Sequence, residues 1–314
     1  MKIPILLITH DRPYLLDKVL NRLIKYTDWK EFELWICSNA STSANEKIIK
    51  AYAERYKGIN VFYQDVNQIS LIQNNLINKL RVERYIKLDD DILVSENWYK
   101  GFIGLAERHG KDMSIGSVVI PVNGFGWLPF LEIMGYIEEF RFKFPEVALI
   151  QGCMEPAAWY DNEVNKYLWE KSLNIDETSQ QFTTKQKIFK DIEVPFRYSI
   201  GAIVFSHEFW QKMNGWKVHH SFTRNKRIYD ALSLINNNIA RLRGRKEQRK
   251  VQKIIKILSG MNQSALGIEE EYLFEFSKKH GYKQFVTTES IVFHFAFGPT
   301  EDYLMKNIYL DINF

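Results

Sequence analysis

The sequence predicts an α/β fold built on a mostly parallel, doubly wound sheet with helices on both faces. Two observations carry this prediction. Apolar runs of strand length alternate four times with segments of helical periodicity within the first 97 residues, and such alternation is typical of βα units around a parallel sheet. These runs are apolar at nearly every position, as expected for strands that are buried on both faces.

The elements of this first part follow in a regular order. Residues 3–9 form the first expected strand, and a helix follows from Pro13, a residue suited to the first helical turn. The next expected strands are 32–37, 59–63 and 85–88, and the next helices pass through 48–56 and 69–80. After Trp98 the pattern is less regular. There we expect strands at 118–121 and 198–205, a turn with exposed aromatics at 124–127, and a polar linker or mobile loop at 176–190.

Composition excludes several classes of protein. With 314 residues, 46% hydrophobic and 25% charged, the chain resembles an ordinary globular protein of one large or two modest domains. Its two cysteines predict neither a disulfide framework nor a cysteine-rich metal site, and they favour a cytoplasmic protein. No uncharged apolar stretch reaches about 18 residues, so we expect no transmembrane helix, and any membrane contact would be peripheral.

Positive charge is concentrated in one segment. Between Arg224 and Lys256, eleven Lys and Arg residues face two acids, a local charge of +9, while the rest of the chain sums to −5. Apolar residues at helical spacing predict a basic helical insertion at about 221–260. A solvated helix face is one interpretation; the other is contact with a polyanion, either nucleic acid or an anionic membrane surface carrying a lipid-linked acceptor. The contact residues would be Arg241, Arg243, Arg245, Lys246, Arg249, Lys250 and Lys253.

Three consecutive acids, Asp89, Asp90 and Asp91, end the strand at 85–88. Open α/β sheets bind ligands at the carboxyl ends of their strands. Adjacent carboxylates repel one another unless a positive charge lies between them, and a divalent cation with oxygen ligands would supply it. The alternative is an acidic surface turn, in which Asp is common.

Four motifs in the same order resemble the nucleotide-binding half of a GT-A-fold glycosyltransferase, particularly the large inverting family called family 2. They are residues 8–13, which are close to the family's Thr-Tyr-Asn-Arg-Pro, residues 38–42, close to Asp-Asn-Gly-Ser-Thr, the pair Asn67 and Asn75, and Leu88 to Asp91 for Asp-X-Asp. The chain departs from the family at Ser38, where an Asp usually contacts the donor base or ribose, and it lacks the glycines expected after Asn67.

The resemblance implies a division of labour within one GT-A domain. Residues 1–97 would bind the nucleotide-sugar and residues 98–314 would bind the acceptor and complete the catalytic site. The donor-binding residues implied are Thr9, His10, Arg12, Asn39, Asn67, Asn75, Asp89, Asp90, Gly201, Ala202 and Trp216. The implied cofactor is Mn²⁺ or Mg²⁺, held by Asp91, Asp89 and His294.

The late acids complete the expected site. Residues 267–276 resemble the family's Gly-X-Glu-Asp-X-Asp helix, which places Glu270 on the general base and Glu269 on the preceding acid; Tyr272 stands where the family has its second Asp. The expected function is the metal-dependent, inverting transfer of a sugar from a nucleoside-diphosphate sugar to a hydroxyl of a glycan or lipid-linked glycan. The donor nucleotide is UDP in our first interpretation. A nucleic-acid acceptor is the alternative, and a non-catalytic polyanion-binding protein on the same scaffold is the rival from another class.

Overall fold

The computed structural model describes residues 2–151, 161–218, 268–295 and 300–314. The chain divides into two compact units, one made of residues 1–216 with 273–314 and the other of residues 217–272. The basic segment predicted at 221–260 belongs to the second unit, and all but residues 217–218 and 268–272 of that unit lie outside the described residues.

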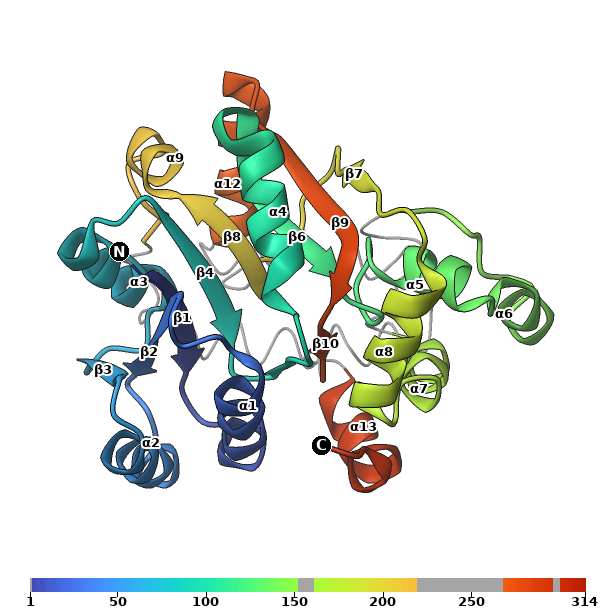
Figure 1. The fold of residues 1–314 in the computed structure, drawn as a ribbon, viewed down its shortest axis with the longest axis horizontal. Coiled ribbons are helices and arrows are strands. Elements are labelled where there is room, and N and C mark those ends of the chain that lie inside the picture. Colours follow the sequence, from blue (N-terminus) through green and yellow to red (C-terminus); the bar gives the residue numbers. More distant parts are fainter. Residues whose placement is uncertain (1, 152–160, 219–267, 296–299) are drawn as a thin grey trace, which may run out of the picture. The chain divides into compact units, whose positions relative to one another are not determined.

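An eight-stranded sheet in the order β3-β2-β1-β4-β8-β6-β9-β7 is the centre of the first unit (Figure 1). Its strands are β1 (Ile3–Thr9), β2 (Phe32–Asn39), β3 (Ile59–Gln64), β4 (Arg84–Asp89), β6 (Met113–Val119), β7 (Asp191–Glu193), β8 (Ala202–Ser206) and β9 (Lys283–Ile291). Strands β1 to β4 are parallel, and β6 is parallel to β9. Strand β8 runs antiparallel to both its neighbours, as β7 does to β9. The predicted α/β class with a mostly parallel sheet is confirmed.

Helices connect and flank these strands. They are α1 (Pro13–Tyr26), α2 (Ser43–Arg55), α3 (Ile69–Leu80), α4 (Tyr99–His109), α5 (Trp127–Met134), α6 (Ile137–Lys143), α7 (Asn162–Glu170), α8 (Ile175–Lys185), α9 (His207–Lys212), α12 (Ile268–His280) and α13 (Glu301–Asn307), with 3₁₀ turns at Gly110–Asp112 and Tyr309–Asp311. Helix α1 begins at Pro13, which fixes φ where the chain needs no N–H donor. Its buried face includes Leu16, Leu20 and Leu23, spaced as an amphipathic helix requires. Figure 1 shows α4 across the middle strands, where it packs on β6, β8 and β9.

A second, two-stranded sheet joins the residues just after β4 to a segment near the C-terminal end of the chain. Strand β5 (Ile92–Leu93) pairs antiparallel with β10 (Phe293–His294), with His294 opposite Ile92. The Phe295 amide also donates to the Asp91 carbonyl at 2.9 Å. This pairing places a late histidine beside the acid triplet, although about 200 residues separate them in sequence.

Two local expectations were wrong. The aromatics at 124–127 are not exposed: Phe125 and Trp127 are buried, and Trp127 opens α5. The segment 176–190, expected as a linker or loop, contains most of α8. Asn174 caps that helix by accepting a hydrogen bond from the Glu177 amide at 3.3 Å, which satisfies a donor that the first turn would otherwise leave unpaired. Across the described ranges, no helix is long and apolar enough to cross a bilayer.

Candidate functional site

The acid triplet lies at the carboxyl end of β4, beside the end of β1. Ile8 pairs with Asp89 in the parallel register, so the residues that follow β1 and those that follow β4 leave the sheet at the same edge. Carboxyl ends of neighbouring parallel strands are where α/β sheets bind their ligands. The three acids nevertheless have three different environments.

Asp90 is tied to the end of β1. The Thr9 hydroxyl donates to Asp90 Oδ2 at 2.7 Å, and the His10 amide lies 3.4 Å from the same oxygen. Asp90 is 5% exposed. Burial and the neighbouring Asp91 charge raise the pKa of Asp90 to about 7, although Thr9 and Arg12 favour the ionised form. We infer that Asp90 mainly holds two chain segments together.

Asp91 is the most buried acid of the triplet, at 1% exposure. Arg12 Nη1 lies 2.7 Å from Asp91 Oδ2, and His294 Nε2 lies 3.0 Å from Asp91 Oδ1. Burial alone would raise the pKa of Asp91, but the adjacent His294 and Arg12 outweigh it and hold the pKa below its ordinary value. Both oxygens of Asp91 therefore face a basic group, so a cation that bound this carboxylate would take the place of one of them.

Asp89 is the most accessible member, and a buried lysine holds it. Lys87 Nζ lies 2.5 Å from Asp89 Oδ1 and donates to the Ile200 carbonyl at 2.7 Å. The Lys87 side chain is 2% exposed. Gly201 follows, and its carbonyl accepts from the Asp89 amide at 2.8 Å. A β-carbon at Gly201 would lie 3.3 Å from Asp89 Oδ2 and 3.6 Å from His294 Cε1, so this glycine lets the backbone approach both side chains.

The charges at this edge do not balance. Asp89, Asp90, Asp91 and Glu301 face two permanent cations, Arg12 and Lys87. The positive charge that the triplet requires is therefore supplied in part by the chain itself, and a negative excess remains. No group of three His, Cys, Asp or Glu side chains that could hold a metal is present in the described part of the chain. The donors fit a hard cation that takes one or two protein ligands and completes its shell with phosphate oxygens and water.

Among the other predicted donor-binding residues, His10, Asn39 and Asn67 lie together, whereas Asn75 and Ala202 lie elsewhere. At the ends of β1 and β2, His10 Nδ1 lies 3.0 Å from the Asn39 carbonyl, and Asn39 Nδ2 donates to Asn67 Oδ1 at 2.8 Å. These residues from three motifs therefore form one cluster at the acid edge. Asn75 is exposed on α3. Ala202 opens β8 as a buried residue.

Trp216 lies in the interior. It is 2% exposed, and its ring packs against Phe205 with centroids 5.1 Å apart. Asn74 holds its backbone: Asn74 Oδ1 accepts from the Trp216 amide at 2.8 Å, and Asn74 Nδ2 donates to the Trp216 carbonyl at 2.8 Å. Trp216 thus anchors the segment after α9 to α3.

The predicted catalytic acids lie in the second unit. Glu269 and Glu270 are in the first turn that the structure describes of α12, and Glu270 is half-buried. The assignment of Glu270 as the general base stays a prediction.

Sequence reasoning missed Lys87, Glu301 and Asn74 as residues of this region. Lys87 carried a signal, because it is a charged residue within an otherwise apolar strand, and buried lysines are rare unless paired. Glu301 carried none: it follows the site by about 210 residues, and only the fold brings it to Arg12.

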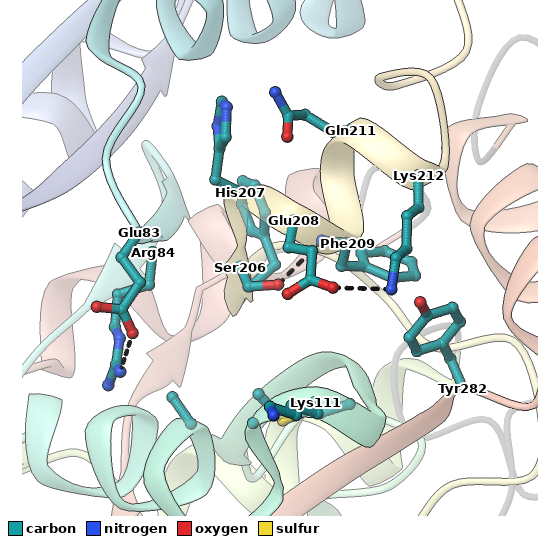
Figure 2. A pocket seen from close by; sticks show the side chains of 14 residues that line it. Glu83, Arg84, Lys111, Ser206, His207, Glu208, Phe209, Gln211, Lys212 and Tyr282 are labelled. Atoms are coloured by element: carbon teal, nitrogen blue, oxygen red, sulfur yellow. Dashed lines mark hydrogen bonds and ion pairs between the residues drawn. The ribbon is translucent and has the colours of Figure 1, made fainter.

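A pocket of about 360 Å³ lies at the opposite edge of the sheet (Figure 2). It is lined mainly by the end of β8 and by α9, together with the residues that open β4 and β6 and Tyr282, just before β9. Figure 2 shows two ion pairs in this lining, Arg84 with Glu83 at 2.6 Å and Lys212 with Glu208 at 2.8 Å, and Lys111 also lines the pocket. The acid edge, where Asp90 and Asp91 are buried side by side, is the better candidate for chemistry.

Comparison with known proteins gives a match to one family. The sequence model described as Glycosyl transferase family 2 matches residues 5–169. None of the curated proteins matches this chain.

Two solved structures are similar to parts of this chain. A mannosyltransferase, PcManGT from Pyrobaculum calidifontis, in complex with GDP-Man and Mn²⁺, is 10% identical, with a TM-score of 0.42 over 69% of this chain and 47% of that one. TarS 1-349 from S. aureus, in complex with UDP-GlcNAc, is 19% identical, with a TM-score of 0.33 over 38% of this chain and 34% of that one. The chain thus spans less than half the length of either protein.

The family match covers more than half of the 314 residues and includes the acid triplet, and the protein therefore belongs to glycosyl transferase family 2.

Proposed function

We propose that this protein is a metal-dependent, inverting glycosyltransferase that moves a sugar from a nucleoside diphosphate, UDP in our first interpretation, to a hydroxyl of a glycan or lipid-linked glycan. The observation that carries the proposal is the buried Asp91 carboxylate. It lies at the carboxyl end of β4, and residues from distant segments, Arg12 and His294, converge on it.

The candidate ligands of the cation are Asp91, His294 and Asp89, of which one or two would contact it directly. Carboxylate donors suit Mn²⁺ or Mg²⁺, whereas an imidazole ligand would favour a transition-metal ion such as Mn²⁺ over Mg²⁺. Such an ion, when bound, offsets the negative charge that builds on the departing diphosphate. Lys87 fixes one oxygen of Asp89 at 2.5 Å, which leaves the other oxygen facing Gly201.

Donor binding is proposed for the polar cluster at the ends of β1 and β2. His10, Asn39 and Asn67 are linked through hydrogen bonds of 3.0 and 2.8 Å, which orients their remaining donors and acceptors before a ligand arrives. Thr9 fixes Asp90 beside this cluster. Orientation of this kind lowers the entropy that is lost when a ligand binds.

Glu270 is proposed as the general base. It would take the proton from the acceptor hydroxyl as the oxygen attacks the anomeric carbon, while the bond to the diphosphate breaks. A positioned base contributes on the order of 10²–10⁴-fold to rate, and one base opposite the leaving group implies inversion. Glu270→Gln should therefore lower turnover by about 10²-fold or more, whereas Glu271→Gln, an exposed neighbour of equal charge, should not.

Nucleic acid as the acceptor is the second candidate, favoured by the local charge of +9 between Arg224 and Lys256. A non-catalytic polyanion-binding protein would share this charge. Salt-sensitive binding to duplex DNA, measured with and without a nucleotide sugar, separates these alternatives: an acceptor site predicts glycosylated DNA, and a binding protein predicts binding alone.

The function is tested by a thermal-shift screen of UDP-, GDP- and other nucleotide sugars with and without Mn²⁺. A ligand present at a hundredfold excess over its Kd stabilises the folded protein by about 2.7 kcal/mol. The proposal predicts stabilisation by one donor class, with Mn²⁺ required. Absence of stabilisation by every nucleotide sugar in Mn²⁺ would contradict it.

A further inference from the structure

Glu301, at the start of α13, reaches the acid edge through Arg12. Arg12 Nη1 lies 2.7 Å from Asp91 Oδ2, and Arg12 Nη2 lies 3.3 Å from Glu301 Oε2. A single guanidinium therefore bridges the most buried acid of the triplet and a carboxylate from the other end of the chain. Arginine is suited to this arrangement because its donors form a planar fork.

The second oxygen of Glu301 is also engaged. The Tyr14 hydroxyl donates to Glu301 Oε1, and the Tyr309 hydroxyl donates to the Tyr14 carbonyl at 3.0 Å. Leu304, on the same helix as Glu301, is fully buried. The carboxylate of Glu301 is thus held in place from its own helix and from the start of α1, whereas Arg12 is the long, flexible partner.

Arg12 and a divalent cation would compete for Asp91. Like charges a few ångströms apart repel strongly where water is partly excluded, so the guanidinium must withdraw from Asp91 Oδ2 when a cation binds there. The Arg12 side chain is 27% exposed, and after withdrawal from Asp91 its other carboxylate partners are Asp90, 3.5 Å from Nη1, and Glu301. Glu301 is the carboxylate already in contact with the opposite nitrogen of the same guanidinium.

We propose that Glu301 is a positioning residue: it holds Arg12 at the acid edge when a divalent cation replaces the Arg12 guanidinium on Asp91. This inference rests on the proposed metal-dependent function. Glu301 thereby favours cation binding through Arg12, in addition to the weak, direct attraction of its own charge. The arrangement also keeps Arg12 beside the phosphates of a bound nucleotide, where a guanidinium is a strong partner.

A double-mutant cycle on Mn²⁺ affinity tests the proposal, with free Mn²⁺ measured by electron paramagnetic resonance at a fixed concentration of UDP. The variants are Glu301→Gln, Arg12→Met and the double variant. Asp302→Asn is the matched control, because it removes an equal charge from the adjacent, exposed position of α13. Circular dichroism melts show whether each variant is folded.

We expect Glu301→Gln to weaken Mn²⁺ binding about tenfold and Asp302→Asn by less than about twofold. In the Arg12→Met background the effect of Glu301→Gln should fall below about threefold, because the residue through which it acts is gone. Arg12→Lys provides a second cycle that does not depend on the folding of Arg12→Met. Its single ammonium cannot bridge both carboxylates, so the Glu301 effect should shrink there as well.

Equal effects of Glu301→Gln with and without Arg12 would overturn the inference, since Glu301 would then act by its charge alone. An effect of Asp302→Asn as large as that of Glu301→Gln would overturn it too. Both outcomes leave the metal-dependent function intact. If the wild-type protein binds no Mn²⁺ with UDP, the metal assignment itself fails, and this inference fails with it.

Discussion

Two ionic networks of this protein use the same residue types and differ in the number and the burial of their carboxylates. At the margin of the sheet, Arg108 binds Asp191 through two hydrogen bonds of 2.7 and 2.9 Å, and it also pairs with Glu289 at 3.0 Å. His109 Nε2 lies 2.8 Å from the same Asp191. This network joins two carboxylates to one arginine and one histidine, and the side chains of Asp191 and Glu289 are 14% and 24% exposed. At the acid edge, four carboxylates face Arg12, Lys87 and one histidine, and the side chains of Asp90 and Asp91 are only 8% and 2% exposed.

This difference indicates that the Arg108 network is structural and that the acid edge is the candidate functional site. A bidentate Arg–carboxylate pair satisfies both oxygens and holds two elements together, and Asp191 joins β7 to the end of α4 in this way. Asp91 is instead held by two different groups, Arg12 on one oxygen and His294 on the other, in nearly complete burial.

The largest expected effect comes from removing the charge at Asp91. Asp91→Asn should lower the rate of sugar transfer on the order of 10³-fold, comparable to the loss of a principal electrostatic contact in other enzymes. Release of the nucleoside diphosphate is the measurement. Asp191→Asn is the matched control and should keep the rate within about twofold, because Asp191 belongs to the network at the margin of the sheet. Equal losses in both variants would show that the two networks do not differ in function.

The next largest effect is expected at Lys87. Lys87→Met leaves Asp89 Oδ1 and the Ile200 carbonyl without their donor, so the free energy of unfolding should fall by about 2–3 kcal/mol. Denaturant unfolding followed by fluorescence measures it. A loss below about 0.5 kcal/mol would mean that water replaces the lysine at no cost and that the pair does not fix Asp89.

Arg108→Ala should be milder. It breaks the bidentate pair with Asp191 at a position where the Arg108 side chain is 32% exposed, so solvent screens the interaction, and we expect a loss of about 1 kcal/mol. Transfer activity should be unaffected. If activity falls by more than the measured loss of stability explains, the Arg108 network would contribute to the function of the site.

The last expected effect is a dependence of stability on pH. Burial alone would raise the pKa of Asp191, but hydrogen bonds from Arg108, Thr287 and His109 outweigh it and lower the pKa from 3.8 to about 2. Because the folded-state pKa is depressed, the stabilisation is present above about pH 4 and is lost as the pH falls toward 2. The stability difference between wild type and Asp191→Asn should therefore shrink over that window. A constant difference would show that the carboxylate titrates alike in the folded and unfolded states.

The first third of the fold could be predicted because each strand there is a continuous apolar run. Strand β1 and helix α3 begin and end where expected, at Ile3–Thr9 and Ile69–Leu80. Helix α8 was missed because its buried face uses Thr178 and Ser179 beside Ile175 and Phe182, so its periodicity is weak in hydrophobicity. The antiparallel insertion of β8 between β4 and β6 depends on contacts across the chain, which local patterns do not contain.

The site was predictable in its acids and less so in its counter-charges. The family resemblance placed His294 with Asp91, and the structure brings them to 3.0 Å. The resemblance also identified Arg12 as a residue that binds the nucleotide-sugar donor. In this structure the Arg12 guanidinium pairs with Asp91, Asp90 and Glu301. Glu301 and Lys87 depend on how distant segments meet. The motifs indicate the candidate ligands, whereas the pairing of these residues with Lys87 and Glu301 is set by the fold.

We propose that the acidic residues around Asp91 bind a divalent cation together with a nucleoside diphosphate. Calorimetric titration of UDP into the protein, in Mn²⁺ and in EDTA, tests it most directly. We predict binding at least about tenfold tighter in Mn²⁺, a difference of about 1.4 kcal/mol, that disappears in Asp91→Asn and persists in Asp191→Asn. Equal affinity in Mn²⁺ and EDTA, or a metal dependence that survives in Asp91→Asn, would contradict the claim.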